Sequence, residues 1–163
     1  MNDPNDPNDP NASNSQNDSS APNEPNDLRS AFVLRCDTIE EAYEFMLAYA
    51  AQGLTGDAGS QSGGQLREFL TRAAAALTGI GDVLSSVIEG EHLEPAARYQ
   101  AYVAVLDRDA RDSLAAVDLV LAQPSISSQL IDNLNASIHL RALLTDLFLI
   151  DELLKSQPAT TRT

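Results

Sequence analysis

Four polar side chains in the C-terminal third of the chain have a spacing that could place them together on one helix. They are Asp132, Asn135, His139 and Asp146, separated by three, four and seven residues. Because residues at these separations share one face of an α-helix, a continuous helix would align them in a stripe. A histidine flanked by carboxylates can relay protons or bind a divalent ion, so the stripe is a candidate small-ligand or metal site. The plainer interpretation is the solvated side of a helix.

Other residues with reactive or metal-binding side chains carry weaker signals. Glu89 and His92 have the Glu-x-x-His spacing of helical di-metal sites, but a glycine stands between them and there is no second copy of the motif. Cys36 is followed by an aspartate and lies in an apolar stretch, whereas a cysteine nucleophile needs an electropositive setting. The glycines of residues 53–64 lack the Gly-Lys-Ser/Thr ending of a phosphate-binding loop. The sequence therefore predicts no catalytic residue and no cofactor.

The elements that position these side chains are predicted from apolar residues that recur every three or four positions. Thr38 and Glu41 have the spacing of a capping box, and the apolar period that follows predicts a first helix over residues 38–52. Residues 28–36 include an apolar, partly β-branched stretch. Three interpretations stay open for this stretch: a short strand, an extended arm or a first helical turn.

A second, longer helix is predicted after a glycine-rich loop over residues 53–64. Apolar residues at alternating spacings of four and three predict this helix over residues 65–89. Gly79 and Gly81 weaken its middle by about 1 kcal/mol each relative to alanine. One helix with a soft middle is expected, and two shorter helices are the alternative.

A third helix is predicted over residues 95–123, with a proline at its first position and another just beyond its end. In its middle, Asp107 can pair with Arg111 and Arg108 can pair with Asp112, each four residues apart. Such pairs are typical of a solvated helix face, so we expect this charged segment to be a surface rather than an active site.

A fourth helix, capped by Ser125 or Ser127, is predicted to continue to Leu154. Its second half is apolar on more than one face, so we expect it both to lie centrally in the fold and to bury a side against another molecule. The candidate interface consists of large apolar side chains: Leu140, Leu143, Leu144, Leu147, Phe148, Ile150 and Leu154.

These elements predict an all-α fold behind a disordered tail. Three long helices and one shorter N-terminal helix are expected to form an antiparallel bundle over residues 28–156, because short connections force neighbouring helices to run in opposite directions. Residues 1–27 consist mainly of Asn, Asp, Pro and Ser, with three tandem Asn-Asp-Pro copies, and cannot offset the entropy of their own ordering. We expect this segment and residues 157–163 to be disordered.

Composition limits the partners and the compartment. Ten Lys and Arg against 24 Asp and Glu give a net charge of −14, which disfavours nucleic acid and anionic membranes as partners. No run of about 18 apolar residues and no secretory signal is visible, so no membrane association is expected. The single cysteine suits a reducing compartment, and a cytoplasmic location is predicted.

The function that these observations favour is that of a non-enzymatic interaction or assembly module. The hydrophobic C-terminal helix is expected to contact a protein partner or a second copy, with a homodimer as the expected form. The alternative is a small-ligand or metal-binding helical domain, possibly an enzyme, that uses the polar stripe around His139.

Overall fold

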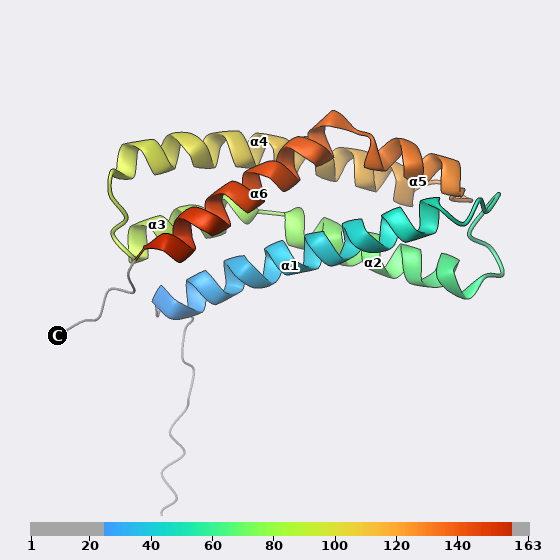
Figure 1. Ribbon diagram of the computed structural model, residues 1–163, viewed down its shortest axis with the longest axis horizontal. Coiled ribbons are helices and arrows are strands. Elements are labelled where there is room, and N and C mark those ends of the chain that lie inside the picture. The colour runs from blue at the N-terminus through green and yellow to red at the C-terminus, as the bar shows by residue number, and fades with distance from the viewer. Residues whose placement is uncertain (1–24, 158–163) are drawn as a thin grey trace, which may run out of the picture.

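The computed structural model describes residues 25–157, which are largely helical and contain no β-strand. The predicted all-α class is confirmed for this range. Figure 1 shows the helices lying along the longest axis of the molecule. They are α1 (Pro25–Ala50), α2 (Gln61–Leu77), α3 (Ile80–Gly90), α4 (Ala96–Leu121), α5 (Ser128–Asn135) and α6 (Ile138–Ser156).

The N-terminal helix begins earlier than predicted, and residues 28–36 are helical. Phe32, Cys36 and Ile39 are buried at spacings of four and three, so this stretch continues the apolar face of the helix. The hydroxyl of Thr38 donates to the carbonyl of Leu34, 2.7 Å away, instead of capping a new helix. With 26 residues, α1 is not the shorter helix that the sequence predicted.

The predicted helix over residues 65–89 is divided at Thr78 and Gly79, so the alternative of two shorter helices is correct. Gly79 adopts a left-handed conformation with φ of 71°, which ends the helical path. Arg35 on α1 donates from Nη1 to the carbonyl oxygens of Ala76 and Thr78, at 2.9 and 2.8 Å, where α2 ends. The arginine therefore satisfies carbonyl groups that the break leaves without helical partners.

The predicted fourth helix is also divided, between α5 and α6. Ser127 caps α5 as predicted, with its hydroxyl accepting from the backbone N–H of Leu130. After the break the phase of the apolar pattern shifts: Ile138 is exposed and Leu140 is buried. A continuous helix would have buried Ile138, because it lies four residues after the buried Leu134.

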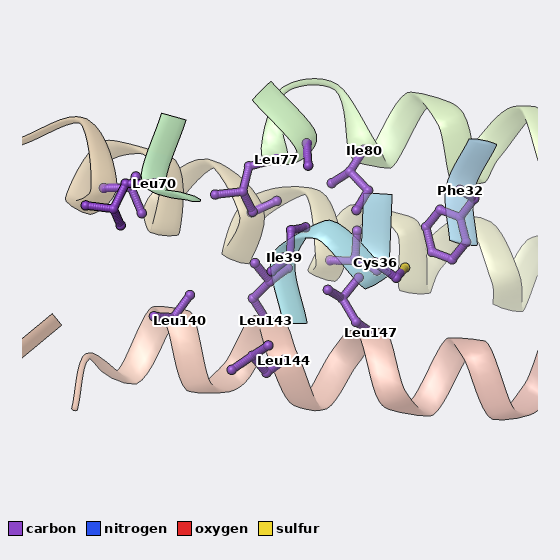
Figure 2. Packing of buried hydrophobic residues seen from close by; sticks show 14 of the residues in the cluster. Phe32, Cys36, Ile39, Leu70, Leu77, Ile80, Leu140, Leu143, Leu144 and Leu147 are labelled. Carbon is purple, nitrogen blue, oxygen red and sulfur yellow. The ribbon is translucent and has the colours of Figure 1, made fainter. Parts of the chain in front are cut away.

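The predicted arrangement of three long helices and one shorter one is therefore wrong in helix number and in the length of α1. Helix α1 packs against α2, α3 and α5, whereas α4 packs against α2, α3 and α6. Figure 2 shows side chains from α1, α2, α3 and α6 meeting in the interior, with Leu143 and Leu147 of α6 beside Ile39 and Cys36 of α1. The core is therefore shared by helices that are distant in the sequence.

The boundaries of the predicted tails fall partly outside the described residues. Residues 25–27, assigned to the N-terminal tail, belong to α1, and Gln157 follows the end of α6. Residues 1–24 and 158–163 lie outside the described range. Within that range no single helix combines the length and apolar character needed to cross a membrane, although α2 and α3 taken together across their bend meet that criterion by length and composition.

Candidate functional site

The predicted polar stripe is divided by the break between α5 and α6. Asp132 is exposed on α5 and lines an open depression, with a volume of about 470 Å³, beside the loop that follows α1. Asn135 is buried, and neither its amide nitrogen nor its amide oxygen has a hydrogen-bond partner among the described residues. Because the helical path is interrupted after these two residues, they do not continue the face that carries His139 and Asp146.

His139 and Asp146 lie on α6 and face α4, which supplies the polar groups around them. Nδ1 of His139 is 3.6 Å from Oδ2 of Asp112, and both side chains are about half exposed. Oδ1 of Asp146 accepts a hydrogen bond from the hydroxyl of Tyr102 at 3.0 Å. Asp109 lies close enough to Asp146 to affect its ionisation. The structure therefore retains half of the predicted stripe and adds groups from a second helix.

The environment of Asp146 disfavours its charged form. Burial raises the pKa of this carboxyl group; the hydrogen bond from Tyr102 opposes the rise, and the neighbouring Asp109 adds to it. The net pKa of Asp146 is above its ordinary value. Burial, and then the carboxylate of Asp146, also raise the pKa of the Tyr102 hydroxyl. The carboxyl group of Asp146 and the hydroxyl of Tyr102, which lie between α4 and α6, are therefore both shifted toward their neutral forms.

The contact between α4 and α6 also brings together side chains with the donor groups of a divalent-cation site. Ligand atoms of Asp109, Asp112 and His139 all lie within 4.8 Å of one another. Two carboxylate oxygens and one imidazole nitrogen suit a divalent transition metal such as Zn²⁺ or Mn²⁺. Asp112 and His139 are exposed, so such an ion would keep water or an external ligand on its open side.

Sequence reasoning missed Asp109 and Asp112 because it treated their segment as a solvated face. The predicted pair of Asp107 with Arg111 is present, but Asp112 faces His139 rather than Arg108. A signal that could have indicated this contact is a pair of polar residues spaced seven apart on each of the two helices. Tyr102 and Asp109 are seven residues apart on α4, as are His139 and Asp146 on α6.

The remaining candidates for chemistry do not gather into sites. Among residues 25–157 no His, Cys, Asp or Glu side chain completes a group of three ligands with Glu89 and His92. Cys36 is buried, and burial, followed by the charge of Glu40, raises the pKa of its thiol to about 12. A neutral, buried thiol is a poor nucleophile.

The predicted interface is wrong for six of its seven residues, because these residues form the core of this chain. Leu140, Leu143, Leu144, Leu147, Ile150 and Leu154 are all buried. Phe148 is 56% exposed and is the one member that remains at the surface. The prediction failed because the break before α6 sets which face of the helix turns inward, and the sequence pattern did not reveal that phase.

A different set of apolar side chains lies on the outer face of α6. Ile138 is 75%, Leu149 is 50% and Leu153 is 41% exposed. At 3.6 residues per turn these three side chains lie within about 60° of arc, opposite the buried leucines. In Figure 1, α6 runs diagonally across the near side of the molecule. We call Ile138, Leu149 and Leu153 the outer face of α6.

No protein-family model, curated protein or solved structure matches this chain.

Proposed function

We propose that this chain is a non-enzymatic interaction module that docks another polypeptide on the outer face of α6. The observation that carries the proposal is the exposure of Ile138, Leu149 and Leu153 on a helix whose opposite face is already buried in the core. Apolar side chains that recur along one exposed helix face are typical of surfaces that pack against a partner.

The position of α6 in the fold also supports this proposal. The inner face of α6 is fixed by the core, so its outer face is held in a defined orientation before any partner binds, which reduces the entropic cost of association.

We also propose that the helices form an antiparallel bundle. In this bundle α2 and α3 together form one bent helical segment, and α5 and α6 together form another. We also propose a cytoplasmic location, in keeping with the free, buried Cys36.

The experiment that tests docking compares charged substitutions at two leucines that are exposed to a similar extent. Leu149→Glu alters the outer face of α6, and Leu47→Glu alters a leucine on α1 that is 48% exposed. Proteins that co-purify with the tagged chain are produced separately, and their binding to the purified variants is measured. We expect Leu149→Glu to weaken binding at least tenfold and Leu47→Glu to leave it unchanged. Binding that is equally sensitive to both substitutions, or to neither, would contradict the proposal.

As a second candidate function we propose divalent-cation binding between α4 and α6. The supporting observation is the convergence of Asp109, Asp112 and His139 from two helices. Within residues 25–157 no arginine or lysine forms an ion pair with these carboxylates, so a cation would supply the missing positive charge.

Calorimetric titration with Zn²⁺ and with Mn²⁺ tests this second candidate. We expect His139→Ala to abolish binding of Zn²⁺, while Asp132→Asn, a control at an exposed carboxylate on α5 outside the cluster, retains it. An unchanged enthalpy of titration in His139→Ala would rule out the cluster as the binding site.

A further inference from the structure

We infer that the partner of the outer face of α6 is a second copy of this chain, packed with its own α6 antiparallel about a two-fold axis. The inference rests on the proposed docking function and names the occupant of that surface. The arrangement of apolar and charged residues on this face is self-complementary in the antiparallel direction, as an isologous two-fold contact requires.

The apolar residues define the register. A two-fold axis between Thr145 and Asp146 places Ile138 of one copy opposite Leu153 of the second copy. The same axis places Ala142 opposite Leu149. Each large exposed side chain therefore meets an apolar residue across the axis. Asp146 lies at the centre, where its hydrogen bond with Tyr102 holds the carboxyl group on the side of α4.

The charges on one flank of the outer face fit the same register. Arg141 and Glu152 are both exposed, and neither forms an ion pair in the described part of the chain. They lie on the same flank of α6, about 16 Å apart along its axis, too far for a direct contact within one copy. In the antiparallel register Arg141 comes within about 3 Å along the axis of Glu152 from the second copy, once at each end. A parallel two-fold pair would instead place Arg141 of one copy and Glu152 of the second copy on opposite flanks of the contact and about 16 Å apart along the axis.

The size and charge of the surface indicate a weak complex. A contact between two single helices buries less than the roughly 1,200 Å² of a small stable interface, so we expect a dissociation constant in the micromolar range or above. The net charge of −14 on each copy also opposes association, and salt screens that repulsion. Dimerisation is therefore expected to respond to protein concentration within an experimentally accessible range.

The first experiment measures the mass of the purified full-length chain by sedimentation equilibrium from about 10 µM to about 1 mM, a range that brackets a weak complex. We expect a monomer–dimer equilibrium that Leu149→Glu shifts toward monomer at least tenfold and that Leu47→Glu leaves unchanged. Circular dichroism and thermal unfolding of each variant confirm that the fold is retained. A chain that is monomeric throughout this range overturns the inference, as does a dimer that is insensitive to Leu149→Glu.

A charge exchange tests the antiparallel register independently of folding stability. Arg141→Glu and Glu152→Arg, made singly, are each expected to weaken the dimer about tenfold, because each places two pairs of like charges in the contact. The double variant restores the opposite pairs, so its dissociation constant is expected to return to within about threefold of the original. Arg141→Glu makes the net charge more negative by 2 and Glu152→Arg makes it less negative by 2. Weakening by both singles therefore cannot come from net charge.

The two proposals fail in different ways. If the chain is monomeric but a co-purified protein binds in a manner that depends on Leu149, the second copy is wrong as the occupant and the docking function stands. If the dimer forms but the double charge variant does not restore it, the antiparallel register is overturned. If neither self-association nor any partner depends on Leu149, the docking function itself is contradicted.

Discussion

Asp57 in the loop after α1 and Arg67 on α2 form an ion pair, with Nε of Arg67 2.5 Å from Oδ2 of Asp57. The same guanidinium donates to the carbonyl oxygens of Leu121 and Gln123 at the end of α4. The other oxygen of Asp57 accepts from the backbone N–H of Ile126 at 2.7 Å. This pair therefore joins the loop before α2 to the segment between α4 and α5, and holds the glycine-rich loop against the helices.

Substitution of Asp57 is expected to change the dependence of stability on pH. Burial acts to raise the pKa of Asp57, but the hydrogen bonds from Ile126 and Arg67 lower it overall, below the ordinary 3.8. The charged form is thus favoured by folding, so its contribution is complete above about pH 4 and is lost as pH falls through the lower pKa of the folded state.

We expect Asp57→Asn to reduce the free energy of unfolding at neutral pH by roughly 2 kcal/mol. The difference from the original chain is expected to shrink as the pH falls below about 4. Urea unfolding followed by circular dichroism across this range measures both effects, with Asp132→Asn as a control on an exposed carboxylate. A difference between the original chain and Asp57→Asn that is constant with pH would contradict this account of the pair.

Leu147 and Leu149 are expected to respond differently to truncation although only one residue separates them. Leu147 is fully buried in the core, whereas Leu149 is half exposed on the outer face of α6. Leu147→Ala should lower the free energy of unfolding by about 2 to 5 kcal/mol, because it removes packed methyl groups and leaves a cavity. Leu149→Ala should change it by less than about 0.5 kcal/mol in the monomer.

Urea midpoints measured at low protein concentration separate the two leucines, since any dimer is then dissociated. A small effect of Leu147→Ala under these conditions would indicate that this side chain is not part of the monomer core. The comparison therefore tests the assignment of the inner and outer faces of α6.

The periodic apolar pattern was sufficient to predict helices, and insufficient to predict where they break. The pattern passes through Gly79 without losing its spacing, yet Arg35, 44 residues earlier in the sequence, caps the carbonyl groups that the break exposes. A contact between segments so far apart leaves no mark on local periodicity. The same holds for the break before α6, which determines that Leu140 is buried and Ile138 is not.

The cluster of Asp109, Asp112 and His139 illustrates the same limit for the candidate site. His139 was identified from spacing within one helix, but the two aspartates lie on α4 and become neighbours only when that helix packs against α6. Asp132 and Asn135 join the stripe only if the helix is continuous, and the break between α5 and α6 separates them from it. The sequence shows which residue types can bind an ion, but tertiary packing decides which of those residues come together.

Cys36 is expected to be unreactive while the chain is folded. Its pKa of about 12, against an ordinary 9.0, lowers the thiolate fraction near pH 8 by about a thousandfold, and burial also blocks access to the sulfur. Labelling with a chromogenic disulfide reagent should therefore be slow in native buffer and fast in concentrated urea. Rapid labelling of the native chain, at a rate that does not change with urea, would show that the thiol is accessible.

Gly79 provides a test of the break between α2 and α3 in which the sign of the effect is decisive. Alanine at this position must adopt the left-handed conformation, with φ of 71°, at a cost of about 1 to 2 kcal/mol. If residues 65–89 formed one continuous helix, the same substitution would instead stabilise the chain by about 1 kcal/mol. Gly64 in α2 is the matched control, since a Cβ there meets nothing within 4 Å and φ is not positive, so Gly64→Ala should stabilise by about 0.5 kcal/mol. Thermal unfolding of the two variants should thus show opposite shifts in Tm, and a higher Tm for Gly79→Ala would contradict the break.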